Sequence, residues 1–209
     1  MQHITLLGDS IFDNASYVAG APSVIEQVQR QLPMGWQATL RAVDGDTTAK
    51  VQQQLHLLPE GTTHLVLSVG GNDALGCIAS LNAPATSVKQ ALVTLTRMKS
   101  DFQANYQALL AKLKSAEIPL MVCTIYDSVP GLPTELRTAL GIFNDVILSE
   151  AIKHGLPVLD LRMICTEPGD YSSKSPIEPS SQGGEKLAKR LVSSVLAYDF
   201  ESADCRIFW

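Results

Sequence analysis

The chain has 209 residues, of which 45% are hydrophobic and 18% are charged, and this composition fits one globular domain over residues 1–209 with a sizeable core. A formal net charge of −5 and scattered Lys and Arg residues predict neither a nucleic-acid partner nor attraction to an anionic membrane. Residues 1–4 lack the features of a signal peptide, and no apolar run has transmembrane length, so we expect a cytoplasmic protein without a membrane partner.

Short apolar runs alternate along the chain with stretches of helical spacing. Strands are expected at residues 4–7, 38–43, 63–69, 119–125 and 157–161. Helices are expected at about residues 22–32, 46–58, 87–116, 134–154 and 183–196, with Asp46 or Thr47 capping the second. Residues 162–181 read as irregular, and the tail, 203–209, reads as an extra strand or an apolar plug. This alternation predicts a parallel sheet with helices on both faces, a three-layer α/β/α sandwich.

Four cysteines are widely separated and form no Cys-x-x-Cys pair. They are Cys77, Cys123, Cys165 and Cys205. A cysteine zinc site is therefore not expected, and the four side chains are interpreted as reduced thiols.

The first three predicted strands each end in a polar loop that contains glycine. These loops are Gly8-Asp9-Ser10, Gly45-Asp46-Thr47 and Gly70-Gly71-Asn72-Asp73. A lone Gly-Asp-Ser is more typical of a simple turn, but the carboxyl ends of parallel strands meet at one edge of a sheet. There Ser10 supplies a nucleophilic hydroxyl. The backbone N–H groups of Ser10 and Gly45 and the amide of Asn72 supply donors for an oxyanion, as acyl transfer requires.

In order, spacing and strand context, these loops resemble the first three blocks of the SGNH, or GDSL, hydrolases. The resemblance implies a flavodoxin-like sheet of about five parallel strands. It also implies hydrolysis of esters or thioesters without a metal or an organic cofactor. Carried over by position, Ser10 is the nucleophile, and Ser10, Gly45 and Asn72 form the oxyanion hole.

The fourth block departs from the family's Asp-x-x-His pair, so any triad here is atypical. Ser175 stands in place of the aspartate and Glu178 in place of the histidine. The four histidines of the chain are expected at the sheet edge opposite Ser10. Glu178 is therefore the best candidate base, although its lower reference pKa costs roughly 3 kcal/mol of proton-accepting power unless burial raises it. The alternative is that Glu178 is a surface or capping carboxylate beside the N-terminus of the last helix.

Other interpretations stay open at this point. Asp9, Asp13, Asp73 and Glu178 are candidate oxygen ligands for a cation, but their spacing matches no metal motif. Arg162 either binds a substrate carboxylate or forms a salt bridge, with Glu167 or Asp170 as its partner. The leading hypothesis is a serine hydrolase of small esters with weak or atypical activity. The rivals are a non-catalytic receptor for anions or carboxylates and a flavodoxin-like nucleotide binder, which would lack the usual Gly-x-Gly-x-x-Gly loop.

Overall fold

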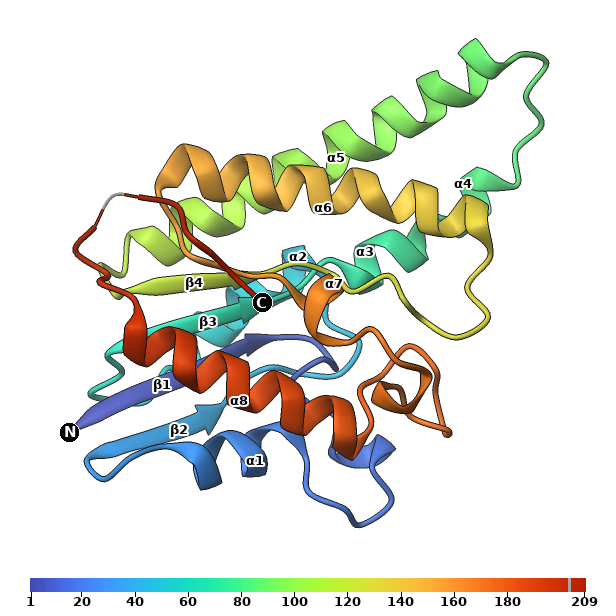
Figure 1. Ribbon diagram of the computed structural model, residues 1–209. Helices are drawn as coiled ribbons and strands as arrows, with labels where there is room; N and C mark the ends of the chain where they lie inside the picture. The colour runs from blue at the N-terminus through green and yellow to red at the C-terminus, as the bar shows by residue number, and fades with distance from the viewer. Residues whose placement is uncertain (203) are drawn as a thin grey trace.

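A computed structural model describes residues 1–202 and 204–209 as helices packed on both faces of one parallel sheet (Figure 1). The six strands lie in the order β2-β1-β3-β4-β5-β6. They are β1 (Gln2–Gly8), β2 (Trp36–Leu40), β3 (His64–Ser68), β4 (Leu120–Cys123), β5 (Val158–Leu159) and β6 (Ile207–Phe208). The predicted α/β fold is confirmed, with one strand more than the family resemblance implied.

The sixth strand comes from the C-terminal tail. β6 pairs in parallel with β5, and the N–H of Val158 donates to the carbonyl of Arg206 at 2.8 Å. The N–H of Asp160 donates to the carbonyl of Phe208 at the same distance. The tail is therefore an extra strand, as one of the two expectations held. Residue 203, the first of the predicted tail, lies outside the described residues.

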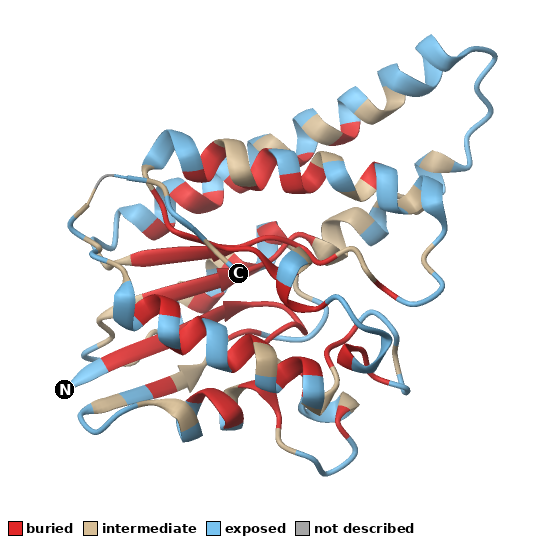
Figure 2. Ribbon diagram, viewed as in Figure 1, coloured by how far each residue is buried: buried red, intermediate tan, exposed pale blue. Residues whose placement is uncertain are grey.

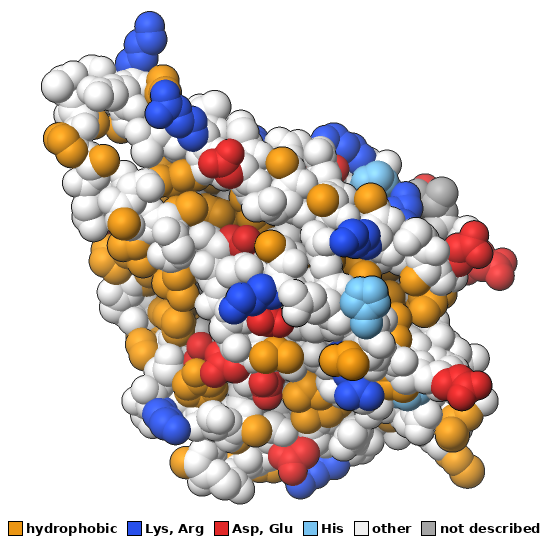
Figure 3. Space-filling view, turned by 180° about the vertical axis from the view of Figure 1, so that it is seen from behind, with side chains coloured by type: hydrophobic (Ala, Val, Ile, Leu, Met, Phe, Trp, Pro, Cys, Tyr) orange, Lys and Arg blue, Asp and Glu red, His pale blue; other side chains and the backbone are white. Residues whose placement is uncertain are grey.

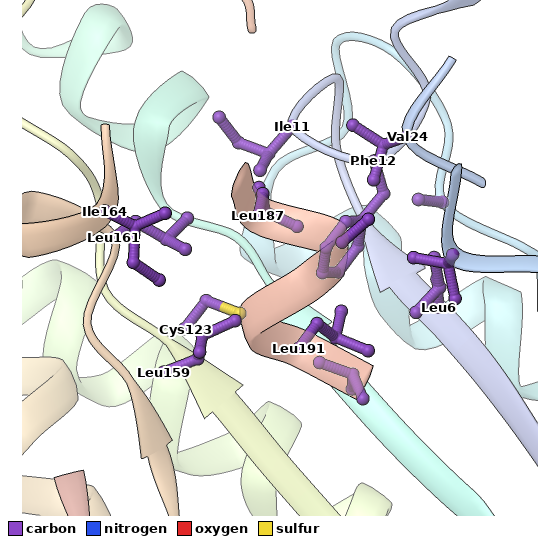
Figure 4. Packing of buried hydrophobic residues seen from close by; sticks show 14 of the residues in the cluster. Leu6, Ile11, Phe12, Val24, Cys123, Leu159, Leu161, Ile164, Leu187 and Leu191 are labelled. Atoms are coloured by element: carbon purple, nitrogen blue, oxygen red, sulfur yellow. The ribbon is translucent and has the colours of Figure 1, made fainter. Parts of the chain in front are cut away.

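Two groups of helices cover the two faces of the sheet. α1 (Val24–Gln31) and α8 (Ser181–Ala197) pack on one face, and α2 (Thr48–Gln54), α5 (Val88–Lys114) and α6 (Thr134–His154) pack on the other. β1 lies between them and has six of its seven residues buried, because a central parallel strand is covered on both faces (Figure 2). Figure 4 shows Leu187 and Leu191 of α8 packed over Leu6 and Cys123 of the sheet.

Short helices account for most differences from the predicted elements. Two follow β3 where no helix was expected, α3 (Gly71–Gly76) and α4 (Ile78–Leu81). Within the stretch predicted as irregular, α7 (Leu161–Ile164) and a 3₁₀ turn at Pro168–Asp170 form. A helix of one turn carries too few apolar repeats to show a 3.6-residue period, so its sequence gives little signal.

None of the helices in the described part of the chain is long and apolar enough to cross a membrane. All four cysteines are free thiols.

Candidate active site

Gly8 makes the turn that carries Ser10. It ends β1 with φ at +131°, and a Cβ placed on it would come within 1.8 Å of the carbonyl oxygen of Ser68 on β3. Only glycine therefore allows the two strands to approach so closely here. The chain then turns, and Ser10 follows with 7% of its surface exposed.

The buried side chain of Gln54 ties the end of β1 to the loop after β2. Its Oε1 accepts from the N–H of Gly8 at 2.9 Å, and its Nε2 donates to the carbonyl of Gly8 at 2.8 Å. The same Nε2 donates to Oδ2 of Asp46 at 2.9 Å. One amide side chain therefore holds the Ser10 loop and the Gly45 loop in register.

Asn72 and Asp73 tie the loop after β2 to the loop after β3. Nδ2 of Asn72 donates to the carbonyl of Asp46 at 3.0 Å. Oδ2 of Asp73 accepts from both the N–H and the hydroxyl of Thr48, each at 3.0 Å. The predicted cap of α2 is thus corrected. Thr47 occupies the N-cap position without a side-chain capping bond, and Asp73, distant in sequence, satisfies the first turn.

The three candidate oxyanion donors follow adjacent strands. Among the described residues, the backbone N–H groups of Ser10 and Gly45 have no hydrogen-bond partner, and Asn72 retains a second amide hydrogen beyond its bond to Asp46. Ser10 and Asn72 line the pocket described below. Gly45 is exposed on the neighbouring loop and is not among the lining residues.

The loop that carries Glu178 is bound to the Ser10 loop by buried polar contacts. Nδ2 of Asn14 donates to the carbonyl of Pro179 at 3.0 Å, and Asn14 is fully buried. The hydroxyl of Tyr126, which follows β4, donates to the carbonyl of Ile177 at 2.6 Å. The backbone on both sides of Glu178 is therefore anchored.

The side chain of Glu178 is buried and lines the same pocket as Ser10. Glu178 is 4% exposed, and its Oε2 has no hydrogen-bond partner among the described residues. Its pKa is raised to about 7, chiefly by burial, while the hydroxyl of Ser10 lowers the pKa and the charge of Asp44 raises it. α8 is capped instead by Ser180, whose Oγ accepts from the N–H of Gly183 at 3.1 Å. Glu178 is thus neither a surface carboxylate nor the cap of that helix.

Asp9 is a second buried carboxyl beside Ser10, with 2% of its surface exposed. Its pKa is raised to about 8, chiefly by burial and in smaller part by the negative charges of Glu178 and Asp73. The N–H of Ile11, which donates to Oδ1 at 3.2 Å, lowers the pKa. From sequence, Asp9 was considered only as a possible cation ligand. The only sign of burial in the sequence is that Asp9 lies between an apolar strand and the apolar residues Ile11 and Phe12.

The acidic side chains of this edge do not gather as a cation site. No group of three or more His, Cys, Asp or Glu residues in metal-binding proximity occurs in residues 1–202 and 204–209. Asp13 accepts instead from the N–H of Asp44 at 3.0 Å, and Asp73 accepts from Thr48 in the first turn of α2.

The histidines lie where the sequence placed them, away from Ser10. His3 is on β1 and its Nε2 contacts the hydroxyl of Thr39 at 2.8 Å, while His64 begins β3. The rise from His3 to Gly8 is about 16 Å, beyond any hydrogen bond. The other two are His56, in the 3₁₀ turn after α2, and His154, at the end of α6.

Arg162 is a structural residue with a different partner from those expected. It forms a bidentate pair with Asp160, with Nε to Oδ1 at 2.8 Å and a terminal nitrogen to Oδ2 at 2.5 Å. Lys186 is the residue that binds Glu167 and Asp170. The salt-bridge interpretation is confirmed, and the predicted partners are wrong. The guanidinium pairs instead with Asp160, which lies only two residues away in the chain.

A largely apolar pocket of about 110 Å³ opens beside Ser10. Its polar lining includes Asp9 and Ser10 after β1, Asn72 in α3 and Glu178 in the loop before α8. Much of its apolar lining comes from the helices α3 to α6, with Leu75, Ile78, Leu81, Met98, Leu140 and Phe143 among the residues. The sequence did not predict this pocket, because α3 and α4, which form one wall, were not expected.

The protein is therefore of the α/β/α class, with a polar site at the carboxyl edge of its parallel sheet. The GDSL-like lipase/acylhydrolase family matches over residues 6–186, and the chain belongs to this family. The suspected SGNH/GDSL membership is thereby confirmed. No curated protein sequence matches the chain.

Several solved structures share the fold. A lipase/acylhydrolase from Enterococcus faecalis is 25% identical, with a TM-score of 0.67 over 93% of this chain and 95% of that chain. The lipase Lip_vut3 from a goat rumen metagenome has a TM-score of 0.71 at 18% identity, over 93% and 97% of the two chains. The esterase EstA from a Pseudoalteromonas species, in a form inhibited by monoethylphosphonate, has a TM-score of 0.68 at 16% identity, over 93% and 96%.

Proposed function

We propose that residues 1–209 act as one serine hydrolase domain that cleaves small esters through a Ser10 acyl-enzyme. The observation that supports this most directly is that the Ser10 hydroxyl and the Glu178 carboxylate are both buried at one pocket, where the hydroxyl lowers the pKa of the carboxylate. Covalent catalysis requires a nucleophile close to a base.

In the proposed reaction, Oγ of Ser10 bonds to the acyl carbon while its proton passes to Glu178. The N–H groups of Ser10 and Gly45 and the amide of Asn72 donate to the oxyanion. The intermediate then collapses, the ester C–O bond breaks, and Glu178 returns the proton to the leaving alkoxide. Water next gives a proton to Glu178 and its oxygen bonds to the acyl carbon. The bond between that carbon and Oγ of Ser10 then breaks, the acid leaves, and Glu178 returns the proton to Oγ.

The raised pKa of Glu178 makes this carboxylate a plausible replacement for imidazole. A base works best when its pKa is near the working pH, and burial brings the pKa of Glu178 to about 7. About half of Glu178 would then be ionised at neutral pH. The energetic penalty expected for a carboxylate base is removed by its apolar surroundings.

We also propose that hydrolysis is slow. Among the described residues, no hydrogen-bond partner holds Oε2 of Glu178, whereas a triad base is oriented by a third group. Oxyanion stabilisation and substrate binding alone supply about 10³–10⁴-fold over water. Activity above this level, but below that of an enzyme with a complete triad, is therefore expected.

The apolar pocket supports an ester with a small hydrocarbon group on its acyl side. Its helical lining offers dispersion contacts to hydrocarbon, and its polar groups lie beside Ser10. Several structural neighbours are described as lipases or esterases, and this supports the same substrate class.

A non-catalytic receptor for small carboxylates is the second candidate, favoured by the free N–H groups of Ser10 and Gly45 and by the lack of a histidine at the site. A fluorophosphonate probe separates the two, as it bonds covalently only to an activated serine. We expect mass spectrometry to find the label on Ser10 and none on Ser10→Ala. A folded protein that stays unlabelled beside a reactive control hydrolase would support the receptor instead.

A further inference from the structure

The start of α5 and the loop before it project from the body of the protein as an arm, defined here as residues 82–97 (Figure 1). Every residue from 82 to 93 is exposed, in contrast to the buried middle of the same helix (Figure 2). α5 is thus longer than the sheet face that it covers.

An apolar stripe runs from the core out along this arm. Met98 and Phe102 are buried in the body, and Val88, Leu92 and Leu95 continue the stripe at helical spacing. The side chains of Val88 and Leu92 are 78% and 56% exposed. A hydrophobic stripe that continues beyond its packing partners is a feature of surfaces that bind something else.

The charge of this region is opposite to that of the rest of the chain. Residues 74–100 contain Lys89, Arg97 and Lys99 and no acidic residue, so all 21 Asp and Glu residues of the chain lie elsewhere. Lys99 pairs with Asp145 at 2.5 Å, while Lys89 and Arg97 form no ion pair with any described residue. Figure 3 shows cationic and hydrophobic side chains together on the projecting arm.

The arm is continuous with the apolar pocket. Leu75, Ile78 and Leu81, which line the pocket, immediately precede it in the chain, and Met98 lines the pocket just after it. Leu75 is 42% exposed, so the apolar surface extends from the pocket lining towards the arm. A molecule bound along the arm would therefore lie close to the pocket.

We propose that the arm docks on the surface of an anionic phospholipid bilayer, with Val88 and Leu92 at the acyl boundary and Lys89 and Arg97 beside the lipid phosphates. Apolar side chains flanked by cations are the chemistry that holds helices at such surfaces. The net charge of −5 does not prevent this, because charges more than about 10 Å apart are screened from one another. A second copy of the chain fits less well, since a symmetric arm-to-arm contact would bring like cations together.

Sedimentation with vesicles tests this directly, on Ser10→Ala so that no lipid can be cleaved through Ser10. We expect binding to vesicles of equal parts phosphatidylglycerol and phosphatidylcholine, and at least about tenfold weaker binding to phosphatidylcholine alone. In this background, Lys89→Gln with Arg97→Gln and, separately, Val88→Ser with Leu92→Ser should each weaken binding to the anionic vesicles by about tenfold.

Matched controls are available on other surfaces. Lys189→Gln with Arg190→Gln removes two exposed cations from α8, and Leu57→Ser with Ile152→Ser removes two exposed apolar side chains. We expect neither pair to change vesicle binding. Circular dichroism should show that every variant is folded.

Three outcomes would overturn the proposal: no binding to anionic vesicles, equal losses in the control pairs, or a dimer in light scattering that Val88→Ser with Leu92→Ser dissociates. The last would make the arm an interface between copies. Vesicle binding does not depend on catalysis, so it can hold even if the proposed hydrolysis fails. Conversely, the arm variants should leave the hydrolysis of a water-soluble ester by the Ser10 enzyme unchanged.

Discussion

The carboxylate of Glu178 and the hydroxyl of Ser10 line the same pocket, and the hydroxyl lowers the pKa of the carboxylate, although the two residues stand near opposite ends of the chain. Asn14 holds the two loops together, because its side chain donates to Pro179 and accepts from the N–H of Val24 at 2.8 Å. The neighbours of Ser10 in sequence thus position the neighbours of its proposed base.

Glu178→Gln should abolish most ester hydrolysis. The amide keeps the size of the side chain but accepts no proton, and general-base catalysis is worth about 10²–10⁴-fold. Steady-state kinetics on a water-soluble ester would measure the loss in kcat. Glu185→Gln, an exposed carboxylate on α8, is the matched control and should be neutral. If Glu178→Gln kept full activity, Glu178 would have no part in the mechanism.

The pH profile should report the ionisation of Glu178. The base must be deprotonated, and burial raises its pKa to about 7, so kcat/KM should rise with pH and level off above about 7. A rise centred near 4, the range of an exposed carboxyl, would contradict the assignment. The measurement needs an ester that is stable across that range without enzyme.

Asp9→Asn should stabilise the protein at alkaline pH. The folded-state pKa of Asp9 is raised from an ordinary 3.8 to about 8, so the folded protein binds a proton that the unfolded chain releases. The stability that this proton contributes is complete below pH 3.8 and is lost as the pH rises towards about 8. Asparagine resembles the protonated acid and removes that loss.

Urea unfolding at pH 5 and pH 8 would measure this effect. The wild-type free energy of unfolding should fall between the two pH values, and that of Asp9→Asn should fall less. Asp101→Asn, an exposed carboxyl on α5, should follow the wild type. If the free energy of unfolding fell equally for Asp9→Asn and the wild type between the two pH values, Asp9 would be ionised in the folded protein.

Gly8→Ala should destabilise the fold by more than about 3 kcal/mol, because its Cβ would come within 1.8 Å of the Ser68 carbonyl. Gly35→Ala is the matched control, since Gly35 also has a positive φ, +87°, but no atom within 4 Å of its Cβ position. It should cost only about 1–2 kcal/mol of conformational strain. Thermal unfolding would measure the loss of stability in each variant. Equal losses would show that the close approach of Gly8 to Ser68 contributes nothing to the difference in stability.

Long, regular elements could be predicted from the sequence because their patterns repeat. The helix expected at residues 134–154 is α6, and it ends at Gly155 in the left-handed conformation typical of a helix terminus. The strands before Ser10, Gly45 and Asn72 were recognisable as apolar runs that end in glycine. The order of these loops was also enough to suggest the family.

The elements that the sequence missed are short or depend on distant partners. α3 and α4 are too brief to show a period, and Asp73 rather than the expected Asp46 or Thr47 caps α2. Such contacts join residues far apart in the chain, so no local pattern encodes them. The apolar pocket was missed for the same reason.

The sequence by itself determined the α/β alternation, the strand-end loops and the replacement of histidine by Glu178. The tertiary structure alone shows that Glu178 is buried at the pocket that Ser10 lines, that Asp9 is a second buried acid, and that the first turns of α5 project beyond the body. The physical reason is that a side chain's type is local, whereas its burial, and therefore its pKa, depends on segments that only folding brings together.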